Sequence, residues 1–536
     1  MTSVAQFSDV QPTDWAYQAL SNLVERYGCV AGYPNGTFKG KQAMTRFEAA
    51  ALLNACLDRV TEVTDELRRL QKEFAKELAI LKGRVDKLEA KVGKLEATQF
   101  STTTKLQGET TWALGGVGFG IGNAGTNASN STNSTNLNNA RYGGTTFNYD
   151  LRLNLSTSFT GKDLLYTRLR AGNFLGSAFA GNPYKVLTLD KASPGSSTSG
   201  GTSLNDVFYL DRLYYRFPAG KELTFMVGPK MRNTEALAIT PFYYGDVALL
   251  DNFTVWGAPG AYNKATGGGA AVIWKQNVKK GQPFFGASVS VIAPNAFSAD
   301  TNTGNTASGV ALSNTASGGI FNNGSATNLL IQTGYQADQW KATFAWRYGS
   351  CGQQVNRQGS TAGVAGEACP GVTTGWNGTN VDSNNFALGL AWTPKKNGTI
   401  VPSVSAGWGY SAYNQTGISA PATTLTSGDQ LVIGNIGATQ SWTVALQWKD
   451  AFVKGNSAGM AVGQPSFVTS LRNGQTAQDG NYAWEWWYKF QVTDNISVTP
   501  ALFYLSNPSS AGVNASATTN IGANALGGLV MAQFKF

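Results

Sequence analysis

The spacing of hydrophobic positions changes once along the chain, near residue 100, from a helical pattern to an alternating one. Before this point the apolar residues lie three or four apart, as in the seam of a coiled coil. After it they recur at every second position, as on a strand with one apolar and one polar face. The pattern therefore predicts a helical N-terminal part followed by a large, mainly β structure.

The helical part of the pattern covers residues 58–99. Its apolar ladder consists of Val60, Val63, Leu67, Leu70, Phe74, Leu78, Leu81, Val85, Leu88, Val92 and Leu95. Two consecutive four-residue gaps form a stutter, which locally relaxes a left-handed supercoil. Glu, Lys and Arg fill the flanking positions, so we predict a coiled-coil stalk. The alternative is one amphipathic helix lying on another domain, and the mixed Val and Leu seam leaves dimer and trimer open.

Residues 100–536 contain several segments of about ten residues in which apolar and polar positions alternate. The segments are FNYDLRLNLS from Phe147, WKATFAWRY from Trp340, SWTVALQW from Ser441 and YAWEWWYKFQV from Tyr482. Their apolar faces begin or end in Trp and Tyr, as do the aromatic girdles of membrane barrels. We predict an antiparallel transmembrane β-barrel of about 16 strands. A soluble β-sandwich is the alternative, but its outer faces would be less uniformly aromatic.

The connections between these segments alternate between short and long. Thr160–Asp163 and Asp494–Asn495 are tight turns, whereas residues 121–143, 191–204, 294–327 and 350–382 are long and rich in Ser, Thr, Asn and Gly. Short turns at one end and long loops at the other are typical of outer-membrane barrels. Residues 238–253 fit the alternation poorly. They are a candidate for an inward-folded constriction loop, with an ordinary extracellular loop as the alternative.

The amino-acid composition excludes several classes of function. Charged residues make up 14% of the chain, below the roughly 25% of ordinary soluble domains, and no apolar run of about 20 residues provides a transmembrane helix. The chain has no histidine, which excludes Ser-His and Cys-His nucleophilic sites and imidazole zinc sites. We therefore expect no enzyme activity, no metal and no cofactor.

Charge and cysteine content add two expectations. The net charge of +9 lies mainly after residue 100, without a clustered basic run, so we expect no nucleic-acid partner. The cysteines fall as Cys29 with Cys56 and Cys351 with Cys369. In an exported chain this even count suggests disulfides, although free buried thiols fit the first pair equally well. No apolar signal segment opens the chain, as expected of a mature form with an added start Met.

Residues 1–57 predict a small module with two amphipathic helices. The first helix starts after Thr13 or Asp14. The second starts at Thr45, and Glu48 completes a capping box three residues later. A turn at Tyr33-Pro34-Asn35-Gly36 separates them.

This module resembles an S-layer homology (SLH) domain. The matching motifs are Phe7-Ser8-Asp9-Val10, Trp15-Ala16, Gly32 to Phe38, and Thr45-Arg46-Phe47-Glu48. The sequence departs from the family pattern at Asn35, where Asp is usual, and at Phe47, where a small residue is usual.

The SLH resemblance implies binding of a cell-wall polymer attached to peptidoglycan. Arg46 would pair with an anionic group of the polymer, as a guanidinium suits a carboxylate, and Trp15 and Asp9 would shape the pocket. Gly32, Thr45 and Glu48 complete the predicted set. The alternative is that Arg46 only caps a helix and Trp15 is core. SLH repeats usually occur in threes, so the single repeat predicts a homotrimer.

The order of SLH domain, coiled coil and barrel resembles the cyanobacterial SLH-bearing porins, which are grouped with the OprB-like carbohydrate-selective and iron uptake porins. This resemblance implies passive diffusion of small hydrophilic solutes, namely inorganic ions and sugars, across the outer membrane. The domain boundaries would be 1–57, 58–99 and 100–536, with the first two parts in the periplasm and lipid around the barrel. The alternative is a mainly structural tether between membrane and wall with a nearly closed barrel.

We predict a polar, net positive pore lining. The predicted lining residues are Arg152, Arg168, Arg170, Arg212, Arg216, Arg232 and Asp246, with Lys230 near them. Rings of Arg favour anions through the field in the pore. Alternatively, these cations are paired with Asp150, Asp211, Asp246 and Asp251 in a transverse field.

Overall fold

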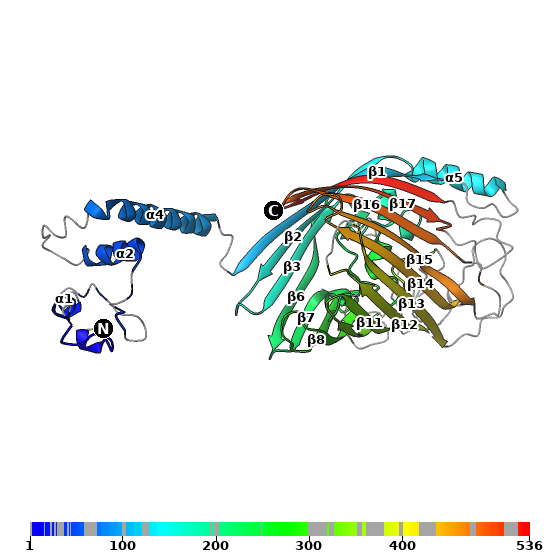
Figure 1. The fold of residues 1–536 in the computed structure, drawn as a ribbon. Helices are drawn as coiled ribbons and strands as arrows, with labels where there is room; N and C mark the ends of the chain where they lie inside the picture. Colours follow the sequence, from blue (N-terminus) through cyan, green and yellow to red (C-terminus); the bar gives the residue numbers. More distant parts are fainter. Residues whose placement is uncertain are drawn as a thin grey trace. The chain divides into compact units, whose positions relative to one another are not determined.

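The computed structural model divides into two compact units, Met1–Thr102 and Thr103–Phe536 (Figure 1). The residues that it describes are 3–14, 17–21, 24–25, 28, 30, 37–39, 42, 44–57, 72–98, 103–120, 128–192, 196–197, 203–247, 249–297, 319–320, 326–350, 356–360, 380–395, 400–416, 436–471, 477, 479–508 and 524–536.

The first unit is helical. It contains the 3₁₀ turn η1 (Val4–Gln6) and helices α1 (Tyr17–Ser21), α2 (Arg46–Leu57) and α4 (Ala75–Thr98). Its core includes Phe7, Leu20 and Cys56, and Cys56 takes part in a disulfide. The other three cysteines lie outside the described residues.

The predicted start of the second helix is confirmed. The backbone N–H of Glu48 donates to Thr45 Oγ1 at 3.2 Å, and the backbone N–H of Thr45 donates to Glu48 Oε2 at 2.8 Å. This reciprocal capping box satisfies donors that the first helical turn leaves free. Helix α2 therefore begins where the sequence places it.

The predicted stalk is described only in part. Residues 75–98 form the single helix α4, while residues 58–71 and 99–100 lie outside the described residues. Val85, on the predicted seam, is 50% exposed in the single chain. A coiled coil requires partner helices, so this part of the prediction stays a prediction.

The second unit is a closed antiparallel barrel of sixteen strands, in agreement with the predicted number. Neighbouring strands follow sequence order, and β1 closes the barrel by pairing with both β2 and β18. The barrel strands are β1 (Thr104–Phe119), β2 (Thr146–Thr157), β3 (Leu164–Gly172), β6 (Tyr209–Ala219), β7 (Leu223–Arg232), β8 (Thr266–Lys275), β9 (Phe284–Ala293), β10 (Asn328–Gln336), β11 (Trp340–Gly349), β12 (Asn380–Trp392), β13 (Ser403–Thr416), β14 (Ile436–Lys449), β15 (Ser457–Leu471), β16 (Tyr482–Thr493), β17 (Ile496–Ser506) and β18 (Ala525–Lys535).

Alternation along each strand sets an apolar outer face and a polar inner one. Phe147, Trp340 and Leu526 are more than half exposed, whereas Asp150 and Arg347 point inward and are buried. Such an outer face suits contact with lipid. None of the described helices is long and apolar enough to cross a membrane.

The predicted tight turns at 160–163 and 494–495 are present, whereas the predicted long loops at 294–327 and 350–382 lie mostly outside the described residues. The tight turn between β2 and β3 is held by the carboxylate of Asp163, which accepts the backbone N–H groups of Phe159 and Thr160 at 3.0 and 2.8 Å. The predicted long loop at 121–143 is instead partly the helix α5 (Ala128–Tyr142). The Asn139 amide joins it to β1 through both backbone groups of Phe119, which explains why this Ser-, Thr- and Asn-rich segment is ordered.

Smaller elements lie between the barrel strands. They are η3 (Ala178–Ala180), η4 (Lys185–Leu187), β4 (Ser196–Ser197) and β5 (Ser203–Leu204) before β6, and η5 (Asn233–Glu235) and η6 (Asp251–Val255) after β7.

Candidate functional site

The connection between β7 and β8, residues 233–265, lies inside the barrel. Its backbone N–H groups donate to inward-facing side chains of successive strands, so the segment crosses the lumen. These bonds join Ala238 to Ser288 of β9, Ile239 to Gln332 of β10, Tyr243 to Ser405 of β13, Gly245 to Gln447 of β14 and Leu250 to Glu485 of β16. The candidate segment 238–253 is therefore folded inward, and the alternative of an ordinary extracellular loop is wrong.

Two other connections meet this segment through ion pairs. The fully buried carboxylate of Asp251 lies 2.6 Å from Lys264 Nζ and 2.5 Å from Arg357 Nε. Arg357 belongs to the β11–β12 connection. Lys264 also pairs at 2.7 Å with Asp190 of the β3–β6 connection. Burial raises the pKa of Asp251, but the charges of Arg357 and Lys264 outweigh this effect and hold the pKa below its ordinary value. One charged cluster thus joins three inward segments.

One side of the lumen is filled by apolar packing. Phe179, Leu187 and Leu189 of the β3–β6 connection and Leu249, Leu250 and Phe253 of the β7–β8 connection are buried in one cluster. The same cluster includes Ala113 of β1, Phe503 of β17 and Leu529 of β18. Strand β1 pairs with β2, so this apolar side lies next to the charged wall described below.

The charged wall is formed by β2, β3, β6 and β7 and borders a cavity of about 320 Å³. Eight cations and two carboxylates line it, together with smaller and neutral side chains. The lining residues are Arg152, Arg168, Arg170, Ala180, Lys185, Thr188, Asp190, Ala192, Tyr209, Asp211, Arg212, Lys230, Arg232, Thr266 and Arg357. Five of the seven predicted pore-lining residues are brought together here.

The arginines of this wall stand opposite each other on neighbouring strands. Arg152 of β2 faces Arg170 of β3, and both lie within 2.6 Å of the carboxylate of Asp150. Like charges directly opposite destabilise a sheet, so a shared carboxylate offsets their repulsion.

The next pair follows the same arrangement. Arg168 of β3 faces Arg212 of β6, and Asp211 lies 3.5 Å from the first and 3.0 Å from the second. Pairing of the predicted cations with Asp150 and Asp211, which the sequence left as an alternative, is therefore present, whereas Asp251 pairs with Lys264 and Arg357. Asp246 has no ion pair among the described residues.

Two β-bulges shape this cavity. The pairing of β3 with β6 shifts between Arg168 and Leu169, and the pairing of β7 with β8 shifts between Gly228 and Met231. A bulge re-aims the side chains beside it. Neighbouring residues Asp211 and Arg212 therefore both border the cavity, which strict alternation forbids.

Sequence reasoning missed the residues that loops bring to the cavity. Lys185, Asp190 and Arg357 come from two inward connections whose course no periodicity signals. Burial and the nearby Arg357 guanidinium lower the pKa of Lys185, as expected in positive surroundings.

The other two predicted lining residues lie elsewhere. Arg216 is inward-facing but donates to the backbone carbonyl of Glu235 at 2.9 Å and does not line this cavity. Asp246 lines a second cavity of about 200 Å³ that also includes Lys489 and Lys535. Lys191, next to Asp190, borders this second cavity and pairs with Glu109 at 2.5 Å. Consecutive residues of the β3–β6 connection, Asp190 and Lys191, thus border the two cavities.

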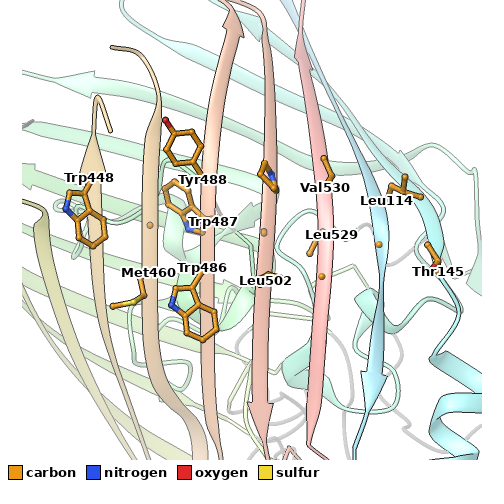
Figure 2. Close-up of a pocket in the computed structure, with 15 residues that line it drawn as sticks. Leu114, Thr145, Trp448, Met460, Trp486, Trp487, Tyr488, Leu502, Leu529 and Val530 are labelled. Carbon is orange, nitrogen blue, oxygen red and sulfur yellow. The ribbon is translucent and has the colours of Figure 1, made fainter. Parts of the chain in front are cut away.

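The outer face carries a third hollow, of about 930 Å³ (Figure 2). Its outward-facing lining includes Trp486 of β16, Leu502 of β17, Val530 of β18 and Leu114 of β1. It lies on the apolar surface that suits lipid.

The predicted wall-binding residues are described only in part. The Asp9 carboxylate accepts the backbone N–H groups of Phe38 and Lys39, each at 2.6 Å, and these bonds lower its pKa. The Arg46 guanidinium lies 5.2 Å from the centre of the Phe74 ring. Trp15 and Gly32 lie outside the described residues. Asp9 thus ties Phe38 and Lys39 to the start of the domain.

Comparison with known proteins assigns both units. Residues 62–536 match the family described as "Carbohydrate-selective porin, OprB family", and residues 6–50 match the S-layer homology domain.

Two cyanobacterial relatives extend over nearly the whole chain. It is 34% identical over 534 residues to alr4550 of Nostoc sp., covering 95% of this chain and 82% of the relative. It is 32% identical over 550 residues to sll0772 of Synechocystis sp., covering 96% and 89%.

Among solved structures, Pseudomonas putida OprB has 12% identity and a TM-score of 0.44, covering 83% of this chain and 96% of that one. At that score the structural likeness carries no part of the assignment, which rests on the sequence matches. The chain belongs to the OprB family of porins and is not an enzyme but an outer-membrane β-barrel protein with an N-terminal SLH domain.

Proposed function

We propose that the barrel is a channel for passive diffusion of small hydrophilic solutes across the outer membrane. The observation that carries this proposal is the pair of polar cavities inside the barrel, which are bordered by the consecutive residues Asp190 and Lys191. Buried charged side chains around unfilled space favour water and polar solutes over apolar ones.

Inorganic ions are the first solutes we propose, with sugars as the second. The first cavity is bordered by eight cations and two carboxylates, and positive linings favour anions. Arg152, Arg168, Arg170, Arg212 and Arg232 would carry this preference. Passage of sugars is supported by the family description alone.

We also propose that the chain is a homotrimer anchored to a peptidoglycan-linked polymer. A single SLH match at residues 6–50 is one third of the usual three-repeat unit, so three chains would complete it. The half-exposed Val85 supports a stalk of residues 58–99 whose seam is covered by other copies. Of the residues that we assign to polymer binding, Asp9, Thr45, Arg46 and Glu48 are described.

A second candidate function is a structural tether with a nearly closed barrel. The observation in its favour is the filling of the lumen by three inward segments and their apolar cluster. In that case the SLH domain would carry the function and the cavities would not conduct.

Single-channel recording of the full chain in planar bilayers separates the two candidates. The channel predicts water-filled conductance steps in groups of three, one for each protomer. Absence of any conductance from folded, inserted protein would reject the channel and favour the tether. Swelling of vesicles in sugar solutions then tests whether neutral sugars pass.

A further inference from the structure

We propose that the cavity beside β6 and β7 is a saturable binding site for a small inorganic oxyanion such as phosphate. This goes beyond a diffuse preference for anions, because it assigns a place where the ion stops. It rests on the proposed function in one respect: the ion reaches the cavity through the channel.

The first observation is an unpartnered donor on Arg212. This side chain is fully buried; its Nε donates to Glu235 at 2.8 Å and its Nη1 pairs with Asp211 at 3.0 Å. Its Nη2 is buried without a hydrogen-bond partner among the described residues, while the residue lines the cavity. A buried guanidinium N–H without an acceptor costs free energy, which an oxygen in the cavity would recover.

The second observation is positive charge that is not balanced by an ion pair. Within the described part of the chain, Lys185, Lys230 and Arg232 line the cavity and form no ion pair. Arg232 donates only its Nε, to Thr266 Oγ1 at 3.2 Å. Lys230 stands opposite Leu213, directly beside Arg212. Three cations without an ion pair therefore line the same cavity as Arg212.

The balance of donors and acceptors selects the chemistry of the ligand. Both lining carboxylates are already engaged, Asp211 by arginines and Asp190 by Lys264. A neutral sugar presents hydroxyl groups that need acceptors as well as donors, whereas an oxyanion presents acceptors only. Guanidinium groups bind paired oxygens well, so an oxyanion complements this wall.

Binding is tested by titrating inorganic phosphate into the detergent-solubilised full chain in an isothermal calorimeter at low chloride. The native chain should bind phosphate saturably. Lys230→Gln removes one unbalanced charge without breaking an ion pair, and Arg212→Gln removes the free donor. Each should weaken binding about tenfold, as expected for loss of one charge-assisted contact.

Lys341→Gln is the matched control, because Lys341 is a buried lumenal cation on β11 that lies over the Tyr243 ring at 4.1 Å and outside this cavity. Its affinity should equal that of the native chain. Equal weakening by Lys341→Gln and Lys230→Gln would overturn the site, since it would mean that only the total lumenal charge matters.

Conductance of the same preparation keeps this inference separate from the proposed function. A chain that conducts but binds no phosphate saturably would overturn the site alone. A chain that binds phosphate but does not conduct would overturn the channel alone. Migration of unheated and heated samples on gels verifies that each variant barrel is folded. If the Arg212→Gln variant does not fold, the binding measured for Lys230→Gln tests the site by itself.

Discussion

The Tyr244 hydroxyl donates a hydrogen bond to Glu485 Oε1 at 2.6 Å and so fastens the inward β7–β8 segment to strand β16. The other carboxylate oxygen accepts the backbone N–H of Leu250 at 2.9 Å, and Trp487 Nε1 donates to the Tyr244 oxygen at 2.6 Å. These groups are buried, which strengthens the bonds and penalises their loss. This contact is therefore one of those that hold the segment across the lumen.

Tyr244→Phe should loosen the inward segment. The change leaves Trp487 Nε1 and one Glu485 oxygen buried without partners, at a cost of about 1–3 kcal/mol. We expect noisier single-channel currents and a lower temperature of barrel unfolding. Tyr335→Phe, on the outer face, is the control and should change neither quantity. Currents as quiet as those of the native chain would contradict the proposed role of this contact.

Asp150→Asn should increase the preference of the channel for anions. The amide cannot neutralise Arg152 and Arg170, which both lie within 2.6 Å of this carboxylate. The reversal potential in a salt gradient should shift toward that of the anion. Asp206→Asn removes a carboxylate that accepts the Tyr149 hydroxyl at an exposed position, and it should leave the reversal potential unchanged. The same shift in both variants would argue against a lumenal cause.

Arg46→Ala should weaken attachment to the cell wall. If the guanidinium pairs with an anionic group of the polymer, co-sedimentation of the full chain with peptidoglycan sacculi should fall several-fold. Phe74→Ala removes the ring beside Arg46 while keeping the charge, so it should retain most of the binding. Unchanged sedimentation of Arg46→Ala would remove Arg46 from the binding site.

The SLH domain should lose local order at acidic pH through Asp9. Its folded-state pKa lies below the ordinary value because its carboxylate accepts two backbone N–H groups, of Phe38 and Lys39. Folding therefore opposes protonation of Asp9. The ionised carboxylate stabilises the folded domain above the unfolded pKa of 3.8, and this stabilisation is lost as the pH falls through the lower folded-state pKa.

Hydrogen exchange read by mass spectrometry checks this pH dependence. The amides of residues 38 and 39 should be protected in the native chain at pH 6 and less so in Asp9→Asn, and this difference should narrow near pH 3. A difference that does not change with pH would show that the carboxylate charge is irrelevant.

The barrel was predictable because its signal is local. Alternation along Phe147–Leu155 or Trp340–Tyr348 is set by lipid on one side and polar groups on the other, and each strand carries that pattern itself. The capping box at Thr45 and Glu48 is equally local. For residues 238–253 the sequence showed only that strand alternation fails. Their course could not be predicted, because the partners of Tyr244 lie more than 240 residues away along the chain.

The composition of the cavity was less accessible to sequence reasoning. The bulges beside Asp211 and Lys230 break the alternation that placed other residues inward. Lys185 and Arg357 reach the cavity because their loops fold into the barrel. Arg216 faces inward, but it donates a hydrogen bond to the backbone carbonyl of Glu235. The sequence shows which of these residues are charged, but it does not show which ion-pair or hydrogen-bond partner each one has.

Strand β1 determines how a force on the N-terminal unit is distributed over the barrel. It closes the barrel, and it is also the strand that continues from the N-terminal unit. It pairs with β2 from Thr104 and with β18 up to Phe119, and the ring of Phe536 lies so close to Gly108 that a side chain there would clash. With the wall anchoring proposed above, a pull on the N-terminal unit would enter the barrel at Thr104 and run along the strand. The hydrogen bonds on both edges then bear the force in shear and together, instead of opening one after another from an end.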